Sequence, residues 1–218
     1  LIGTHSLFQK KVEYKKLGLI IIDEQHKFGV RQRKELSEKG GNNCDVLVMS
    51  ATPIPRTMMM TVYGDMDLTL IKEKPKNRKK IITYSKLEDK ISEIISFAKK
   101  EIAQKNQIFW VCPLIEESKK VEQQSAVSKY KYLEKYFKGR IGLIHGSLDK
   151  DERNEILNNF LDRKLDILVS TTVIEVGIDF PNANLIIIEN ADKYGLSQLH
   201  QLRGRVGRGS KESYCILM

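Results

Sequence analysis

The sequence of 218 residues has few cysteines and no long apolar run. Its three cysteines, Cys44, Cys112 and Cys215, are far apart and odd in number, which argues against a disulfide framework or a cysteine metal site. Each lies in or beside an apolar stretch, so we expect buried free thiols. No apolar stretch approaches the roughly 18 residues of a membrane-spanning helix, and the N-terminus has no signal-peptide pattern. We therefore expect neither a membrane span nor export.

The sequence also lacks the dipeptide Gly-Lys. Enzymes that hydrolyse ATP with a phosphate loop need a glycine-rich turn ending in Gly-Lys-Ser or Gly-Lys-Thr, because its amides and lysine hold the β- and γ-phosphates. The chain starts at Leu1 without an initiating methionine and stops inside a strand-like run, residues 214–218. We expect a fragment of a longer protein.

Acidic residues are in the minority. The 37 lysines and arginines outnumber the 28 aspartates and glutamates, which leaves a formal net charge of +9. An excess of this size favours an anionic partner, with nucleic acid as the first candidate, and it also promotes solubility. A hydrophobic share of 41% and a charged share of 30% are typical of a soluble globular protein. The length predicts one full domain and part of another.

A cluster of arginine and glycine, residues 203–209, is the most informative feature that is present. Glycine lets a backbone approach a ligand closely, and the arginine guanidinium group forks onto phosphate oxygens. The apolar residues Leu196, Leu199 and Leu202 indicate a short amphipathic turn just before the cluster. The glycines stand in the reverse order from a dinucleotide-binding fingerprint. We interpret the cluster as a phosphate-contacting loop, with a solvated basic loop as the alternative.

The second informative feature is the apolar run Leu19–Ile22, which is followed by Asp23 and Glu24. Such a run is typical of a strand buried on both faces of a parallel sheet, and open α/β sheets bind ligands at the carboxyl ends of their strands. There Asp23 would hold Mg²⁺, and Glu24 would orient and deprotonate an attacking water. A strand that merely ends in polar residues is the alternative, and the arginine cluster favours the phosphate site.

Strand-like runs alternate with helical patterns along the chain, which predicts an α/β fold with a doubly wound parallel sheet. The predicted strands are residues 46–49, 108–111, 141–144, 165–169, 185–188 and 214–218, and the predicted helices lie within 91–102, 127–137 and 149–160. Asp149 and Glu152 have the spacing of a helix capping box. The lysine-rich residues 72–80 are interpreted as an interdomain linker, with a direct contact to DNA as the alternative.

Several segments resemble the motifs of superfamily-two helicases. Residues 23–26 look like motif II, 50–52 like motif III, 170–179 like motif V and 201–208 like motif VI, while residues 3–5 fit the end of the motif Ib region. Longer stretches, residues 23–30, 52–57 and 110–118, resemble the RecG family of branch-migrating DNA helicases. The transcription-repair coupling factors are similar in several of these stretches, but they tend to carry a glutamate where this chain has Gln25.

The resemblance extends over essentially the whole chain and implies its fold and domains. We expect RecA-like doubly wound parallel sheets, the P-loop NTPase helicase core. Residues 1–75 would be the back half of the first motor domain, with motifs Ib, II and III but no phosphate loop. Residues 76–218 would be the second domain, with motifs IV, V and VI. ATP would bind in the cleft between the domains of the complete protein, and the fragment alone would be inactive.

The resemblance also implies cofactors, partners and a task. The cofactors would be ATP and Mg²⁺. The partner would be branched double-stranded DNA, namely forks and four-way junctions, on which a monomeric motor in the bacterial cytoplasm would reverse forks and migrate Holliday junctions in recombination and repair.

Roles for single residues follow from the same resemblance. The implied catalytic residues are Glu24, Gln201, Arg205 and Arg208, and the implied nucleotide-binding residues are Asp23, Gly177, Asp179, Arg205 and Arg208. Asp23 would be the metal ligand, and Glu24 the general base. Arg208 is the first choice for an arginine finger, which stabilises the charge of the transferring phosphoryl group.

Two further sets of residues are implied around this site. His26, Ser50 and Thr52 would relay between hydrolysis and DNA, although the latter two also suit a helix cap and His26 could be an ordinary edge histidine. The implied DNA-binding residues are Thr4, His5, His145, Gly146 and Thr171. They are expected at strand ends or loops, where amides and hydroxyls can contact a phosphodiester backbone, and ordinary turn chemistry is the alternative for each.

Two functions of other classes stay open. One is an ATP-independent nucleic-acid-binding module, which the missing phosphate loop favours for the fragment. The other is a phosphoryl-transfer enzyme for small molecules, such as a P-loop kinase, which the net charge of +9 disfavours. A phosphate loop encoded upstream of this sequence would indicate a motor.

Overall fold

The computed structural model describes residues 1–9, 11–24, 39–40, 44–50, 67–71, 73, 78–113, 119–171 and 179–218. The chain forms two compact units, Leu1–Thr69 and Leu70–Met218. Their assignment as parts of two motor domains, with a boundary after residue 75, stays a prediction. In the described part of the chain, no helix is long and apolar enough to cross a membrane.

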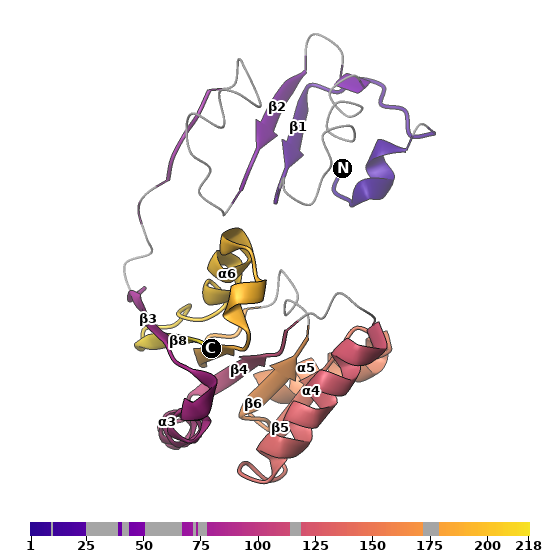
Figure 1. Ribbon diagram of the computed structural model, residues 1–218. Coiled ribbons are helices and arrows are strands. Elements are labelled where there is room, and N and C mark those ends of the chain that lie inside the picture. The colour runs from indigo at the N-terminus through magenta and orange to yellow at the C-terminus, as the bar shows by residue number, and fades with distance from the viewer. Residues whose placement is uncertain are drawn as a thin grey trace. The chain divides into compact units, whose positions relative to one another are not determined.

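The first unit contains the 3-10 helix η1 (His5–Phe8) and two parallel strands, β1 (Leu19–Ile22) and β2 (Asp45–Val48) (Figure 1). The strand β1 forms where the apolar run predicts it, but it is buried on one face only. Ile20 and Ile22 are buried, whereas Leu19 and Ile21 are 55% and 56% exposed. The expectation of burial on both faces is therefore wrong, because no described element covers the face that Leu19 and Ile21 present.

The second unit is built on a six-stranded sheet in the order β3-β8-β7-β4-β6-β5, and every neighbouring pair is parallel. The strands are β3 (Ile81–Ser85), β4 (Gln107–Val111), β5 (Ile141–Ile144), β6 (Ile167–Ser170), β7 (Ala183–Ile188) and β8 (Ser213–Leu217). The predicted parallel sheet is confirmed. The strand β3 was not predicted, because it lies at the sheet edge, is largely exposed and lacks the apolar run that marks the inner strands.

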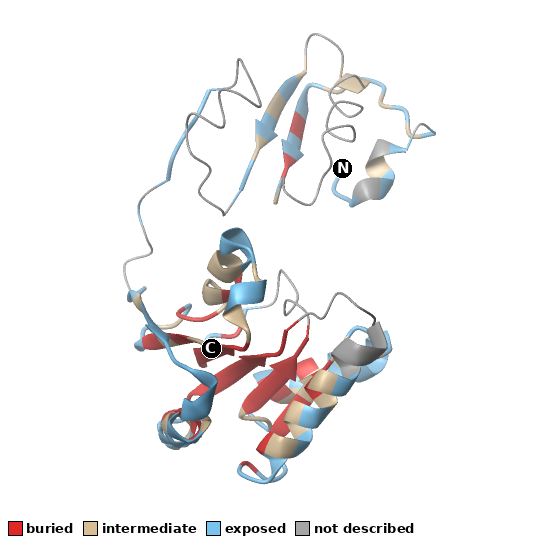
Figure 2. Ribbon diagram, in the orientation of Figure 1, coloured by how far each residue is buried: buried red, intermediate tan, exposed pale blue. Residues whose placement is uncertain are grey.

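Helices cover both faces of this sheet (Figure 2). On one face lie α3 (Ile91–Ala103) and α4 (Lys119–Glu134), and on the other lie α5 (Lys150–Leu161) and α6 (Leu196–Arg203). The central strand β4 shows why: Ile108 and Trp110 pack toward α3 and α4, while Phe109 and Val111 pack toward α5 and α6. All four are at most 1% exposed, so a strand apolar at every position is buried on both sides. Short 3-10 helices, η4 (Glu88–Lys90) and η5 (Ala191–Lys193), complete the unit.

Two local predictions have different outcomes. The carboxylate of Asp149 accepts hydrogen bonds from the backbone N–H groups of Asp151 and Glu152, at 2.9 and 2.8 Å, so the predicted cap at the start of α5 is confirmed. The predicted apolar stripe on α6 is only partly correct. Leu202 is 1% exposed, but Leu196 is 88% exposed because it is the first residue of the helix and extends beyond the packed core.

The three cysteines are free, and two of them are buried. Burial raises the pKa of the Cys112 thiol far above its ordinary value, and the negative charge of Glu189 adds to this effect. Burial likewise raises the pKa of Cys215 to about 11. Both thiols therefore stay protonated near neutral pH. Cys44 is only half-buried, so the expectation of a buried thiol is wrong there, since its sheet has just two described strands.

Candidate functional site

The acidic pair of the first unit follows directly after β1. The side chain of Asp23 folds back, and its Oδ1 accepts a hydrogen bond from the backbone N–H of Glu24 at 2.8 Å. Glu24 has φ of 50°, in the left-handed region that costs a non-glycine residue about 1–3 kcal/mol. Asp23 is exposed and its carboxylate suits Mg²⁺, which prefers oxygen ligands. The turn thus presents Asp23 at the end of the strand, with a strained residue beside it.

Other candidates of the first unit lie near this turn. The backbone N–H of Met49 donates to the carbonyl of Ile22 at 2.8 Å, so the chain that leads to Ser50 leaves β2 beside the end of β1. Thr4 and Asp23 both line a groove of about 700 Å³. The structure therefore brings Ser50 to the same edge as the acidic pair, and it places Thr4 in the same groove as Asp23. His26, Thr52 and Gly177 lie outside the described residues, and for His5 only the backbone, within η1, is described.

In the second unit, the DNA-binding candidates gather at the carboxyl ends of neighbouring strands. His145 and Gly146 follow β5, and Thr171 follows β6. The backbone N–H of Thr171 donates to the carbonyl oxygen of Ile144 at 3.3 Å. Gly146 is exposed, and a Cβ atom there would meet nothing within 4 Å. His145 is half-buried, with its Nδ1 2.8 Å from the hydroxyl of Ser147. Thr171 is 2% exposed, so its side chain lies beneath this edge instead of on it.

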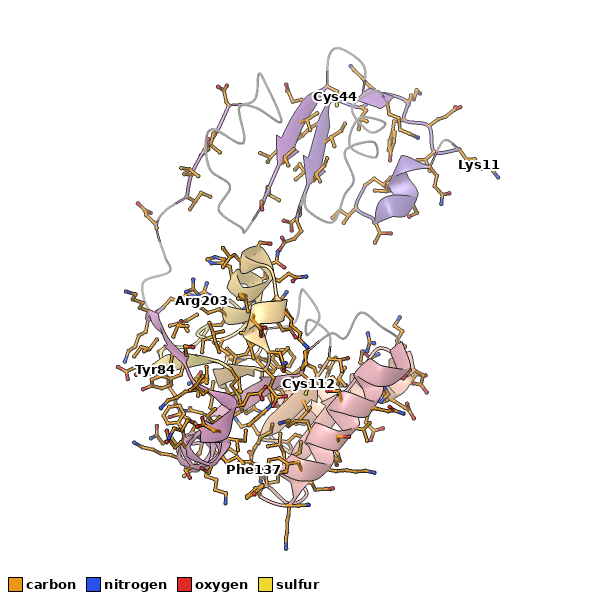
Figure 3. The ribbon with its side chains drawn as sticks, in the orientation of Figure 1. Lys11, Cys44, Tyr84, Cys112, Phe137 and Arg203 are labelled. Atoms are coloured by element: carbon orange, nitrogen blue, oxygen red, sulfur yellow. The ribbon has the colours of Figure 1, made fainter. Side chains whose placement is uncertain are left out.

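The helix α6 supports the arginine cluster. It starts after Gly195, whose backbone N–H donates to the side-chain oxygen of Gln198 at 3.0 Å. Just before it, the hydroxyl of Tyr194 donates to the carbonyl of Cys112 at 2.9 Å, which fixes the start of the helix to the end of β4. Figure 3 labels Arg203, at the end of α6, and Cys112. The candidates Gln201 and Arg205 are half-buried here, whereas Val206 is fully buried and anchors the chain beyond the helix.

Beyond Val206, a tight turn carries Arg208. Gly207 has φ of +75°, and a Cβ atom there would lie 3.0 Å from Cγ1 of Ile81. A Cβ atom on Gly209 would lie 2.7 Å from the carbonyl oxygen of Pro181. Both flanking positions therefore require glycine, the first for its conformation and both for the close approach. The alternation of arginine and glycine has a steric cause in this turn.

The same turn joins two candidates from separate motifs. The Nε atom of Arg208 lies 3.7 Å from Oδ1 of Asp179, and the two side chains are 35% and 61% exposed. An ion pair this exposed contributes little to stability. A phosphate could therefore replace Asp179 as the partner of Arg208 at small cost. The turn adjoins the first residue of β3, Ile81, and so lies at the amino ends of strands, unlike the DNA-binding candidates.

One contact of this turn was missed by the sequence analysis. The Nε atom of Arg78 donates to the carbonyl oxygen of Gly207 at 3.1 Å. The charge of residues 72–80 alone predicts a linker or a DNA contact. No local pattern connects them with the arginine cluster, because the two residues are 129 positions apart.

Comparison with protein families supports the resemblance. The family "Helicase conserved C-terminal domain" matches residues 86–210, and the family "DEAD/DEAH box helicase" matches residues 1–61. Solved structures agree: S. cerevisiae Dbp5 bound to RNA and ADP BeF3 gives a TM-score of 0.68 over 98% of this chain and 56% of that one. At 17% identity that likeness shows the fold alone. The predicted RecA-like helicase fold is confirmed.

Comparison with individual proteins gives a narrower result than the comparison with families. ATP-dependent DNA helicase RecG of Bacillus subtilis (strain 168) is 52% identical over 220 residues, which are 100% of this chain and 32% of that protein. RecG of Thermotoga maritima is 52% identical over 219 residues, 100% of this chain and 28% of that protein. A solved RecG bound to a three-way DNA junction has a TM-score of 0.73 and 48% identity, over 99% of this chain and 28% of that one. The chain thus spans about a third of the length of the RecG proteins it matches.

Proposed function

The chain belongs to the helicase family defined by the conserved C-terminal domain, and on that premise we propose that it is part of the motor of an ATP-dependent DNA helicase that remodels branched DNA. Remodelling here means fork reversal and Holliday-junction branch migration in recombination and repair. The observation that carries the proposal is identity of about half the residues, along the whole chain, to RecG proteins, of which one is solved on a three-way junction.

For ATP hydrolysis, the two units would supply different groups. Asp23, exposed after β1, would hold Mg²⁺, which would neutralise charge on the β- and γ-phosphates. Glu24 would take the proton of the attacking water. From the second unit, Gln201, Arg205 and Arg208 would contact the γ-phosphate, and Arg208 would exchange Asp179 for it. Gly177 and Asp179 would close around the nucleotide.

For DNA, the proposal uses the strand ends described above. Thr4, His5, His145, Gly146 and Thr171 are the proposed contacts. Of these, His145 and Gly146 follow β5 directly, and Thr171 would support them through its backbone bond to Ile144. Contacts of this kind reach phosphates and sugars and carry no sequence information, as a motor that crosses arbitrary sequence requires. His26, Ser50 and Thr52 would form a hydrogen-bonded relay that couples these DNA contacts to the hydrolysis site.

The proposed activity belongs to a longer chain than these 218 residues. Without the amides and the lysine of a phosphate loop, neither positioning nor charge stabilisation of ATP is complete. We therefore predict that residues 1–218 alone hydrolyse ATP at no useful rate, with or without DNA. Release of inorganic phosphate measures this, and robust DNA-stimulated turnover by the isolated 218 residues would contradict it.

The test of the whole proposal gives the full-length protein three DNA substrates with ATP: model forks, four-way junctions and simple tailed duplexes. We expect rapid conversion of forks and junctions and slow unwinding of the tailed duplex. Binding should weaken strongly as salt rises and depend little on sequence, because phosphate contacts release counterions. Efficient unwinding of the tailed duplex without preference for branches would reject branch remodelling and leave the helicase motor intact.

A further inference from the structure

The segment that enters the second unit lies against the turn that carries Arg208. Arg78 donates its Nε hydrogen to the carbonyl of Gly207 at 3.1 Å. Three residues later Ile81 begins β3 and pairs in register with Ser213 of β8. It also lies close to Gly207, because a Cβ atom added to Gly207 would lie 3.0 Å from Cγ1 of Ile81. The chain from 78 to 81 therefore forms one wall of the turn.

The position of this hydrogen bond gives it a mechanical consequence. The carbonyl of Gly207 belongs to the planar peptide unit that joins Gly207 to Arg208. Because that oxygen is held, the orientation of the peptide plane is fixed, and with it the direction in which the side chain of Arg208 projects. Glycine adopts both signs of φ with similar ease, and Gly207, at φ of +75°, could otherwise rotate this plane. On the other side of Arg208, Gly209 is confined by the carbonyl oxygen of Pro181.

We propose that Arg78 is a positioning residue for Arg208: its hydrogen bond to Gly207 holds the turn so that the guanidinium group of Arg208 points where the phosphate arrives. The inference rests on the proposed function, because it concerns the arginine that would act on the γ-phosphate. It also assigns a task to a residue that the sequence alone placed in a linker or on DNA.

Neighbouring residues supply a matched control. Lys79 and Lys80 are exposed and lie on the same segment, and within the described part of the chain their side chains make no hydrogen bond or ion pair. Replacing Lys79 by methionine removes the same charge at the same place without touching Gly207. A role of Arg78 in DNA binding would make the two replacements equivalent, whereas a positioning role makes them differ.

The experiment compares Arg78→Met, Arg78→Lys and Lys79→Met in the full-length protein with saturating branched DNA. We expect Arg78→Met to lower kcat for ATP about tenfold, as for a lost hydrogen bond from a charged donor, with KM for ATP nearly unchanged. Arg78→Lys should recover part of the loss, because an ammonium group can donate to the same carbonyl. Lys79→Met should stay within about twofold of the parent kcat, and both methionine variants should weaken DNA binding equally, each by one charge.

A double-mutant cycle separates positioning from general damage to the fold. In an Arg208→Ala background, Arg78→Met should lower the residual turnover no further, since there is no guanidinium group left to orient. Thermal unfolding midpoints of Arg78→Met and Lys79→Met should agree. Equal kcat for these two variants, or losses that add in the double mutant, would overturn the inference while the proposed function stands. Normal turnover by Arg208→Ala alone would overturn the inference together with the assignment of Arg208 as the arginine finger.

Discussion

Replacement of Arg208 by alanine in the full-length protein is expected to lower ATP turnover by about three orders of magnitude or more, the effect that an arginine finger has on phosphoryl transfer. The charge that develops on the γ-phosphate would lose its bidentate donor. Asp179, the present partner of Arg208 at 3.7 Å, would keep its exposed position, so the fold should persist. Steady-state release of phosphate in the presence of branched DNA measures the loss.

Two further variants make this prediction specific. Arg208→Lys should remain nearly as slow as the alanine variant, because lysine retains the charge but not the planar fork. Lys138→Ala removes an exposed charge between α4 and β5 and should retain full turnover. DNA binding should change little in any of the three. If Arg208→Ala kept near-normal turnover, the finger assignment would be wrong, and Arg205 would be the next candidate.

The Glu24→Gln variant is expected to bind Mg-ATP but to hydrolyse it about a hundredfold more slowly or worse, as for removal of a general base. Glutamine has the same shape and meets the same backbone strain at φ of 50°, so the turn after β1 should be preserved. Binding of a fluorescent ATP analogue and release of phosphate measure the two steps separately.

Asp23 supplies the contrast for this experiment. Asp23→Asn should weaken nucleotide binding in the presence of Mg²⁺, because an amide is a poorer ligand for the metal than a carboxylate. The asparagine side chain should still accept the hydrogen bond from the backbone N–H of Glu24 through its amide oxygen. Loss of nucleotide binding in Glu24→Gln, or wild-type turnover, would contradict the assignment of a general base.

The comparisons narrow the alternatives that the residues left open. Matches to two helicase families over residues 1–61 and 86–210 argue against a small-molecule kinase. Identity of about half the residues to RecG over the full chain favours a RecG-type motor over the coupling-factor motor. For the isolated 218 residues, the missing Gly-Lys dipeptide of a phosphate loop favours a nucleic-acid-binding module without ATPase activity.

The pattern of residue types along the chain predicts the layered fold and most of the candidate residues. Apolar runs such as 108–111 predicted inner strands because a strand packed on both faces is apolar at every position. Asp23, Glu24 and the arginine cluster are predicted as site residues because phosphate chemistry needs particular residue types at short spacing. No such run marks β3, an exposed edge strand, and the apolar run of β1 does not reveal that Leu19 and Ile21 are exposed.

Which distant residues meet at the arginine turn depends on how the sheet of the second unit is assembled. Arg78 and Gly207 are 129 positions apart, and no periodicity of the chain connects them. They meet because β3 and β8 pair in parallel at the sheet edge, which places the entry of one strand against the turn that leads into the other. Local sequence patterns encode secondary structure and burial, whereas the direction of a side chain such as Arg208 depends on contacts that exist only once the sheet has formed.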